Sequence, residues 1–405
     1  MDYLPLANIL HHKLRSVLSA LGIGIGVCMF ITLAGLSRGS LGEIADRWES
    51  VDADLIVFPR GWGENASDKS GSALPDRFAE RIAAAHGRIV RRVIPVFTWQ
   101  FKLAGQDQTA VGVDSDQWGY LTSGRKLSSG RLADPQGRFG RWLNEKLLTA
   151  GTQGDQPLEL TEQDLSDPNH DGLELVIDSR LARAGGYRLG QVVEAANHHW
   201  TIVGIAPAGV MARVFMPRPT AQYLFGNGDV TKSTLMFVKL ADGVDVGPAA
   251  RAIAATTGQE VVPLTRYRGM LLEKFGIMFV YVDAVNVIAM VIAFLFIMIT
   301  LYTMVLQRTR EIAILKSCGA SDFFLLRQVL AESLLLTGAG TAAGVALSFL
   351  AGWIIQAARP LLTVTITGHW IAVAAWVALA GAVAAAGYPA WRATRVDVVE
   401  ALTLE

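Results

Sequence analysis

Residues Ser16 to Ser37 read SVLSALGIGIGVCMFITLAGLS, a stretch of 22 residues without a formal charge between Arg15 and Arg38. A helix of about 20 apolar residues is long enough to cross the hydrocarbon core of a bilayer, whereas a run of about 10 to 14 suits a buried helix of a soluble protein. The length of this stretch therefore predicts a membrane-spanning helix at residues 16–37.

Three further uncharged stretches of this kind lie in the second half of the chain, at residues 284–307, 333–358 and 370–391. With their flanking residues they predict spanning helices at 276–307, 322–358 and 370–391, the last two joined by a short outer loop at 359–369. Four stretches of this length predict an α-helical membrane protein with four transmembrane helices. Half of the residues are hydrophobic, which agrees with this class.

For the first stretch a cleaved signal peptide is the alternative, because it also combines a basic start with an apolar run. This run is longer than the usual signal core and no clear A-x-A site follows it, so we favour a retained helix. Residues 1–15 mix leucine and isoleucine with histidine and lysine, which predicts an amphipathic helix on the cytoplasmic membrane surface. A frayed terminus is the alternative there.

Lysine and arginine near the span ends predict the orientation, because these residues gather in cytoplasmic loops. The loop between the second and third spans and both chain ends are rich in them, whereas the loop between the third and fourth spans has only Arg359. Both termini, including the tail at 392–405, are therefore predicted to be cytoplasmic. The polar residues 38–275 are predicted to lie outside the membrane.

Residues 38–275 are predicted to form a large mixed α+β domain inserted between transmembrane helices 1 and 2, with an insert at about 114–234 as a candidate second subdomain. Period-two or β-branched runs predict strands at 53–58, 90–103, 173–177, 191–195, 200–205 and 235–240. Helical patterns occur at 75–85, 140–148 and 246–256. Proline and glycine mark joints at 60–75 and 207–219.

Glycines occur inside the predicted spans, as Gly22, Gly24 and Gly26 in the first and as Gly340-x-x-x-Gly344 in the third. The first set resembles a dinucleotide-binding fingerprint, but no strand precedes it and no acidic residue follows at the required distance. Small residues allow transmembrane helices to approach closely, so we predict a packing role for both sets.

The chain shows no catalytic or cofactor motif. The nearest approach to a P-loop is Gly119–Gly124 followed by Arg125 and Lys126, which has arginine at the lysine position and lacks the following serine or threonine. His198 and His199 fall in a strand-like run, where neighbouring side chains point to opposite faces, so they do not predict a metal site. We therefore predict no catalytic site, no bound cofactor and no metal site in this chain.

Two other possibilities follow from charge. Asp167, Asn169, Asp171 and Gly172 open like a calcium-binding loop with Asp178 at the twelfth position, although glutamate is usual there and a plain turn explains the run equally well. The 36 basic and 36 acidic residues give a formal net charge of zero. This balance supplies no basic excess for binding nucleic acid.

The loop between the second and third spans reads QRTREIAILKSCGAS over residues 307–321. Its apolar positions form one side of a short helix, predicted at 308–321, and Gly319 is placed to end that helix in a left-handed conformation. Ser321 can cap the next helix. An amphipathic helix with little else to bury predicts a docking element, and a connector touching only lipid headgroups is the alternative.

The motif from Arg308 to Lys316, followed by Gly319-Ala320-Ser321, resembles the signature of the MacB/FtsX/lipoprotein-releasing (LolC/LolE-like) family of ABC transporter permeases. Residues 389–393 and 397–402 are similar to the tail of that family, with Val399 departing from it near an expected proline. Residues 13–26 resemble its entry to the first span, and residues 177–205 resemble a segment of its outer domain.

This resemblance implies a multi-pass permease of the bacterial cytoplasmic (inner) membrane that is not itself an enzyme. ATP and magnesium would be bound by a separate ABC ATPase subunit, and ATPase coupling would fall to Arg308, Arg310, Glu311, Lys316, Gly319 and Ser321. The resemblance also implies a second permease copy, with a homodimer favoured over a heterodimer. A membrane-fusion or other periplasmic protein and membrane lipid are further expected partners.

Two functions are compatible with the resemblance. In the first, ATP-driven motion of the outer domain exports or extracts a hydrophobic substrate such as a lipid, lipoprotein, peptide or drug. In the second, the same motion regulates an extracytoplasmic enzyme, as in FtsX-like members, and no cargo is moved. The outer domain exceeds 200 residues, which favours transport because the regulatory members tend to have smaller domains.

Overall fold

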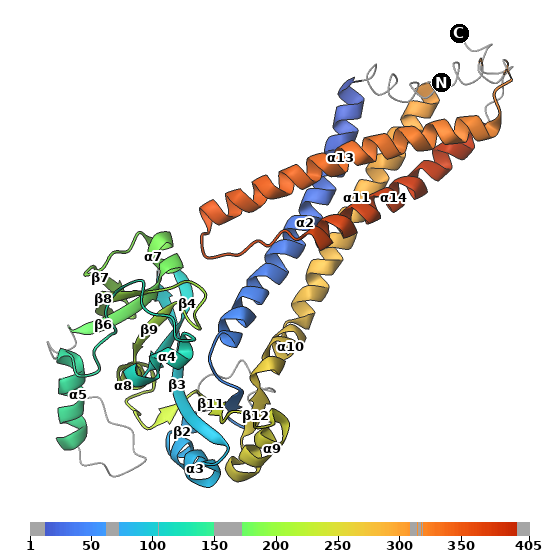
Figure 1. Ribbon diagram of the computed structural model, residues 1–405. Coiled ribbons are helices and arrows are strands. Elements are labelled where there is room, and N and C mark those ends of the chain that lie inside the picture. Colours follow the sequence, from blue (N-terminus) through green and yellow to red (C-terminus); the bar gives the residue numbers. More distant parts are fainter. Residues whose placement is uncertain are drawn as a thin grey trace. The chain divides into compact units, whose positions relative to one another are not determined.

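The computed structural model describes residues 13–61, 73–103, 105–149, 172–307, 314, 317 and 319–394. The chain divides into two compact units, one formed by Met1–Leu41 with Lys274–Glu405 and the other by Gly42–Glu273. We call them the helical unit and the α/β unit (Figure 1). The amphipathic helix predicted at 1–15 lies outside the described residues except for its last three positions.

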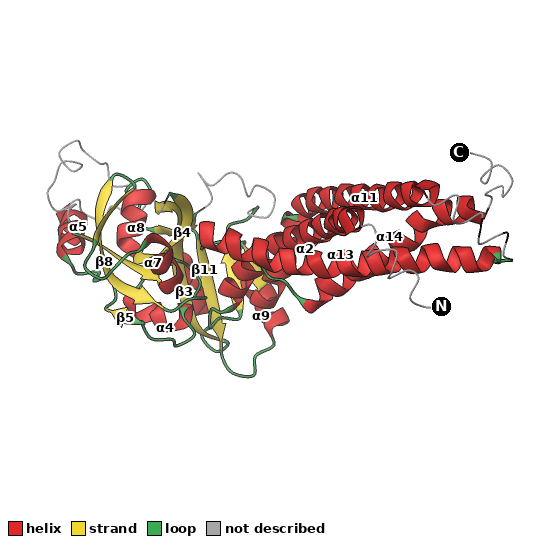
Figure 2. Ribbon diagram, turned by 90° about the horizontal axis from the view of Figure 1, so that it is seen from above, coloured by secondary structure: helices red, strands yellow, loops and turns green. Residues whose placement is uncertain are grey.

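Among the described residues, four long helices belong wholly or mainly to the helical unit (Figures 1 and 2): α2 (Lys13–Glu49), α11 (Gly276–Gln307), α13 (Asp322–Ala358) and α14 (Gly368–Thr394). Within the described residues, Ser16–Glu49, Asp322–Ala358 and Gly368–Tyr388 are long and apolar enough to cross a membrane. A fourth candidate counts only if α10 (Leu264–Lys274) and Gly276–Ile292 of α11 form one bent span. Three candidate spans are therefore observed, and the fourth stays a prediction.

Helix α2 is longer than the span predicted at 16–37, because it continues from Ser37 through a charged segment to Glu49. The prediction used hydropathy, which detects the apolar part of a helix and not the point at which its backbone hydrogen bonds end. The extension has a buried face of its own. Ala45 is 2% exposed and belongs to the core of the α/β unit, where Trp48 packs against it.

The predicted packing role of Gly24, Gly340 and Gly344 is confirmed. A Cβ atom built on Gly340 would lie 2.8 Å from the Cβ of Ile23, and one on Gly344 would lie 2.6 Å from the carbonyl oxygen of Gly24. Helices α2 and α13 approach so closely here that these glycine positions have no room for a Cβ atom. Both distances are shorter than Cβ atoms tolerate, so larger residues would separate the helices.

The α/β unit is built on a ten-stranded sheet, counted over the described residues. Along the main path the strands are β12 (Glu260–Pro263), β1 (Leu55–Phe58), β11 (Leu235–Leu240), β3 (Val90–Leu103), β4 (Gln106–Val113), β9 (Val214–Pro217), β6 (Leu173–Asp178), β8 (His198–Ala206) and β5 (Ser129–Gly130). Strand β7 (Val192–Ala195) pairs with β8, while β2 (Leu74–Pro75) and β10 (Lys232–Ser233) form a separate pair.

The long strand β3 joins the two halves of this sheet. Residues Val90 to Val96 of β3 pair antiparallel with β11, whereas Phe97 to Leu103 pair antiparallel with β4. Parallel pairing occurs between β4 and β9 and between β6 and β8. One strand thus carries two ladders in succession, which makes the sheet continuous between its halves.

The helices of this unit are α3 (Arg77–His86), α4 (Trp118–Leu121) with the preceding 3-10 turn η1 (Ser115–Gln117), α5 (Arg138–Thr149), α7 (Ser179–Gly185), α8 (Arg218–Phe225), α9 (Val246–Thr257) and α10 (Leu264–Lys274). One apolar core contains Ile82 of α3 and Ile253 of α9 together with Val57 of β1. A second core contains Phe215 of β9 and Tyr267 of α10.

Every strand and helix predicted in this domain has a counterpart among the described elements, and the mixed α and β content is confirmed. The joint predicted at 207–219 is wrong in part, because it contains β9 and the start of α8. All four residues of β9 are buried, so the strand has no polar alternation to mark it. Most of the joint predicted at 60–75 lies outside the described residues.

Candidate functional site

The predicted coupling loop is described only in part. Arg308, Arg310, Glu311 and Lys316 lie outside the described residues. Gly319 has φ of +89°, the left-handed conformation predicted for it. In the described part of the chain no heavy atom comes within 4 Å of a Cβ built on this glycine, so its backbone angle, and not crowding, is what favours glycine here.

Ser321 is the N-cap of α13, as predicted. It has extended backbone angles (φ −73°, ψ 151°), and its Oγ accepts a hydrogen bond from the backbone N–H of Phe324 at 3.2 Å. Asp322 follows in the first turn, where a carboxylate is favoured by the helix dipole. Gly319 in the left-handed conformation and Ser321 as the N-cap therefore fix where α13 begins.

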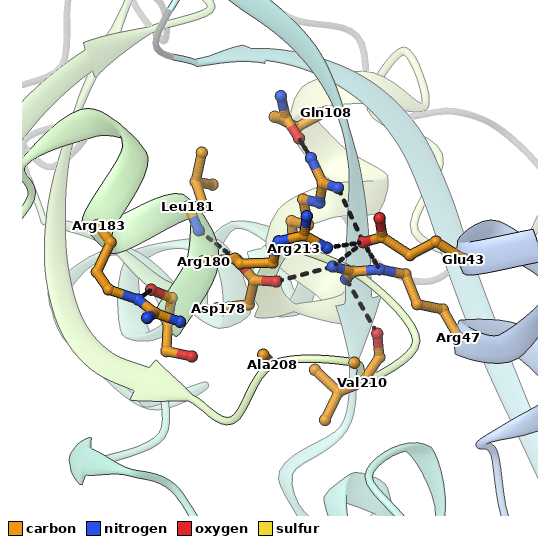
Figure 3. A network of polar contacts seen from close by, with 12 residues as sticks. Glu43, Arg47, Gln108, Asp178, Arg180, Leu181, Arg183, Ala208, Val210 and Arg213 are labelled. Carbon is orange, nitrogen blue, oxygen red and sulfur yellow. Dashed lines mark hydrogen bonds and ion pairs between the residues drawn. The ribbon is translucent and has the colours of Figure 1, made fainter. Parts of the chain in front are cut away.

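The C-terminal turns of α2 carry a second set of polar contacts, centred on Arg47 and drawn in Figure 3. Arg47 is only 6% exposed. Its Nη2 lies 3.1 Å from Oδ2 of Asp178, and its Nη1 donates to the carbonyl oxygen of Val210 at 3.2 Å. The same guanidinium donates to Oε1 of Glu43 from Nε and Nη2, at 3.0 and 2.9 Å. Three groups thus hold this buried cation.

Asp178 is fully buried at the end of β6 and caps α7. Its Oδ1 accepts from the backbone N–H of Leu181 at 2.6 Å, while Oδ2 receives Arg47. Both oxygens are therefore bonded to donors of the protein itself. This argues against Asp178 as the last ligand of a calcium loop, whose other predicted positions, Asp167 to Asp171, lie outside the described residues.

Glu43 gathers three arginines on one carboxylate oxygen. Besides Arg47, its Oε1 lies 2.8 Å from Nη1 of Arg180 on α7 and 3.0 Å from Nη2 of Arg213, which precedes β9. Burial and the neighbouring charge of Arg47 lower the pKa of Arg213, and Glu43 opposes that shift. Removing one partner from buried ion pairs of this kind typically costs about 3–5 kcal/mol, because the other charge is left without compensation.

Helix α10 is tied to the same end of α2. Arg268 donates from Nε to Oε1 of Glu49 at 3.1 Å and from Nη2 to Oε2 at 2.8 Å, and it also pairs with Asp46. The rings of Trp48 and Tyr267 are stacked with centroids 4.5 Å apart. The helix through which the chain enters the α/β unit and the helix through which it leaves are therefore joined by charge and by ring stacking.

This second set of residues has no local signature in the sequence that predicts a site. Glu43 and Arg47 lie only four residues apart, but Asp178 and Arg213 follow more than a hundred residues later, and only the fold brings them together. One signal was present in the sequence. Asp178 stands between an apolar strand and a helix, which is the position of an N-cap.

Comparison with known families decides the class of the protein. Residues 16–256 match the family described as MacB-like periplasmic core domain, and residues 284–398 match FtsX-like permease C-terminal. The chain belongs to the MacB/FtsX-like family of ABC permeases. The first match covers more than half of the chain and contains Glu43, Arg47, Asp178 and Arg213, whereas the second contains the whole predicted coupling loop.

Individual relatives agree with this assignment. The macrolide export ATP-binding/permease proteins MacB of Shewanella oneidensis and Escherichia coli are each 25% identical to this chain. Each alignment covers 97% of this chain and 59% of the relative, so the chain spans about three fifths of the length of these proteins.

A solved structure, the periplasmic region of MacB from Actinobacillus actinomycetemcomitans, is similar over 55% of this chain and 94% of that one. Its sequence identity is 13% and its TM-score is 0.36.

Proposed function

We propose that this chain is the permease subunit of an ABC transporter and that it couples ATP hydrolysis in a separate ATPase subunit to motion of its α/β unit. The proposed motion begins at the coupling loop, where Arg310, Glu311 and Lys316 contact the ATPase and Arg308, Gly319 and Ser321 shape the approach. It reaches the α/β unit through the membrane-spanning helices. ATP and magnesium are bound by the partner, and this chain catalyses no reaction.

The observation that carries the proposal is the continuity of α2. This helix is unbroken from Lys13 to Glu49, and its last turns are fixed in the α/β unit by Arg47 and Asp178. A helix passes its displacement to a domain only if the end of the helix is firmly bound to that domain. Buried pairs at Asp178 and Glu43 hold that end more firmly than surface pairs would, because surface pairs are typically worth only about 0–1 kcal/mol.

The residues that follow the coupling loop support the first step of the proposed motion. The left-handed conformation of Gly319 and the N-cap Ser321 give α13 a defined beginning directly after the loop. Helix α13 then packs against α2 at Gly340 and Gly344, where backbone and side-chain atoms of α2 leave no room for a Cβ atom. Displacement of the loop would therefore be passed to a helix that is in close contact with α2.

The accompanying topology has four spans, both termini in the cytoplasm and the α/β unit outside the inner membrane. The proposed assembly holds two copies of the permease, with the homodimer favoured, and an ATPase subunit docked on each. A periplasmic partner completes the path for cargo. A hydrophobic substrate fits the named export function of the relatives, and an ATP-driven regulator of an extracytoplasmic enzyme is the alternative outcome.

The decisive experiment replaces Glu311 by lysine in the complex with its ATPase partner. We expect the variant to insert normally, because Glu311 lies outside the uncharged stretches of the spans. ATP-dependent motion of the α/β unit, measured between spectroscopic labels on two copies, should be lost together with substrate export. Arg327→Glu, a charge reversal in the exposed first turns of α13, serves as the control.

Normal ATP-driven motion in the Glu311→Lys complex would show that the loop is not the coupling element. Loss of motion in the control as well would show that any charge change near the loop is harmful. If motion depends on Glu311 but no hydrophobic compound is moved under any condition, the regulatory alternative replaces transport.

A further inference from the structure

The segment that joins α13 to α14 lies against α2. We call residues 361–366 the strap. The backbone N–H of Thr365 donates to the carbonyl oxygen of Gly35 at 3.1 Å, and Oγ of Ser40 donates to the carbonyl oxygen of Thr363 at 3.3 Å. The Oγ1 of Thr365 also donates to the carbonyl oxygen of Gly35, at 3.4 Å. Hydrogen bonds in both directions therefore join the strap to consecutive turns of α2.

Glycines in α2 make this approach possible. A Cβ atom built on Gly35 would lie 2.9 Å from the carbonyl oxygen of Thr365. One on Gly39 would lie 2.7 Å from the carbonyl oxygen of Thr363 and would collide with the side chain of Thr365. The obstacles are mainly backbone atoms, which cannot rotate away as a flexible side chain could. Any larger residue at position 39 must therefore displace the strap.

The strap is also held on its other side. The Nε2 of Gln356, in the last turns of α13, donates to the carbonyl oxygen of Val364 at 3.3 Å. Leu361 and Val364 are 6% and 8% exposed. The strap is thus an ordered part of the α13–α14 hairpin, and its contact with α2 belongs to the hairpin as a whole.

A second contact joins α2 to the start of α14 at the same level. The guanidinium carbon of Arg38 lies 4.5 Å from the ring centroid of Trp370 and 5.4 Å from that of Phe279. Cation–π contacts of this geometry are attractive, and Trp370 is the third residue of α14. One turn of α2 therefore contacts α11, α14 and the strap.

We propose that the strap locks α2 to the α13–α14 hairpin, so that displacement of α13 by the coupling loop moves α2 as part of the same body. Gly39 and Thr365 are the positioning residues of this contact. The inference rests on the function proposed above and adds a second place, besides the glycine contacts of α13, at which movement passes from the hairpin to the helix that enters the α/β unit. Close backbone contact suits this role, because it leaves no flexible side chain to absorb the displacement.

The test compares Gly39→Val with Gly42→Val in the full complex with its ATPase. Gly42 lies one turn further along α2, and no described heavy atom comes within 4 Å of a Cβ built there. The measured quantities are the rate of ATP hydrolysis and the ATP-dependent distance change between labels on the α/β units. We expect Gly39→Val to reduce the distance change per ATP hydrolysed by roughly 2- to 30-fold, the range for residues that modulate coupling. Gly42→Val should behave as wild type.

A second arm does not depend on the folding of the valine variant. Ser40→Cys and Thr363→Cys are combined after Cys28 and Cys318 have been replaced by alanine, and the two thiols are joined by a short thiol-specific cross-linker. Because strap and helix are proposed to move together, cross-linked complex should keep the full ATP-dependent distance change. Cross-linking that abolishes this change would overturn the inference, since the strap would then have to leave α2 in each cycle.

The outcomes separate the inference from the function on which it rests. If the wild-type complex shows no ATP-dependent change, the proposed function fails and this inference fails with it. If wild type responds and Gly39→Val responds equally per ATP hydrolysed, only the inference is overturned. A structural role alone would lower thermal stability or insertion in Gly39→Val, and it would leave the ratio of motion to hydrolysis unchanged.

Discussion

The two units hold the same helix by different chemistry. In the α/β unit the last turns of α2 are fixed by charged side chains, with Arg47 buried between Glu43 and Asp178. In the helical unit α2 is held through glycines, at Gly24 against α13 and at Gly39 against the strap. We call the turns around Glu43 and Arg47 the ionic end of α2, and the part from Gly24 to Gly39 its backbone-contact end.

At Gly24, which lies in the uncharged stretch 16–37, the difference follows from the apolar surroundings. In lipid, apolar side chains gain little from packing on one another, and charges are costly, so helices associate through small residues and close backbone approach. In a water-soluble domain a buried charge is tolerated if it is paired and hydrogen-bonded. We therefore expect the ionic end to respond to loss of charge and the other end to respond to added volume.

The largest effect is expected at the ionic end. Arg47→Ala should lower the free energy of unfolding of the α/β unit by about 3–5 kcal/mol, because Asp178 would be left buried without its cation. Thermal and denaturant unfolding followed by near-ultraviolet circular dichroism measures this loss. Arg92→Ala is the matched control, since the side chains of Arg92 and its partner Asp116 are 42% and 61% exposed. The control should lose no more than about 1 kcal/mol.

Similar losses in the two variants would mean that burial does not set the strength of the Arg47 contacts. A full-length Arg47→Ala protein that also keeps wild-type ATP-driven motion would further show that α2 need not be anchored at this point.

At the other end, volume should matter more than charge. Gly344→Val should weaken the contact of α13 with α2 by about 1–3 kcal/mol, the usual cost of overpacking. Gly338→Val is the control on the same helix, because no described atom lies within 4 Å of a Cβ at that position. Thermal stability in detergent is the measurement. Equal behaviour of the two variants would show that the close approach at Gly344 contributes nothing to stability.

Three of the four predicted spans and the cap of α13 could be predicted from sequence because their signals are local. Twenty or more uncharged residues indicate a span wherever they stand, and Ser321 followed by a helical pattern indicates a cap. The ionic end of α2 had no such signal. Glu43 and Arg47 look like an ordinary exposed pair four residues apart, and nothing in the sequence places Asp178 and Arg213 beside them. Likewise, Gly39 is one of many small residues in the sequence, and only the structure shows that the strap lies against it.

A smaller effect is expected where α13 begins. Ser321→Ala removes the acceptor for the backbone N–H of Phe324, and loss of an N-cap typically costs about 1 kcal/mol. Hydrogen exchange of the first turn of α13 should therefore become faster, while exchange further along the helix stays unchanged. Ser321→Asp restores an acceptor and should restore slow exchange. Unchanged exchange in Ser321→Ala would mean that the cap does not stabilise this end.

The smallest effect concerns pH and a less buried ion pair of the α/β unit, that of Asp229 with Lys232. Partial burial alone would raise the pKa of Asp229, but hydrogen bonds from Lys232 and Thr231 outweigh it and hold the pKa below its usual range. A lowered folded-state pKa adds stability above the unfolded-state value and loses it as the pH falls through the folded-state value, here below about 4. Asp229→Asn should therefore be less stable than wild type at neutral pH, and the difference should shrink in acid. Denaturant unfolding of both proteins from neutral pH into acid, followed by circular dichroism, measures this difference. A difference that stays constant in acid would show that the contacts of Asp229 with Lys232 and Thr231 do not stabilise its charged form.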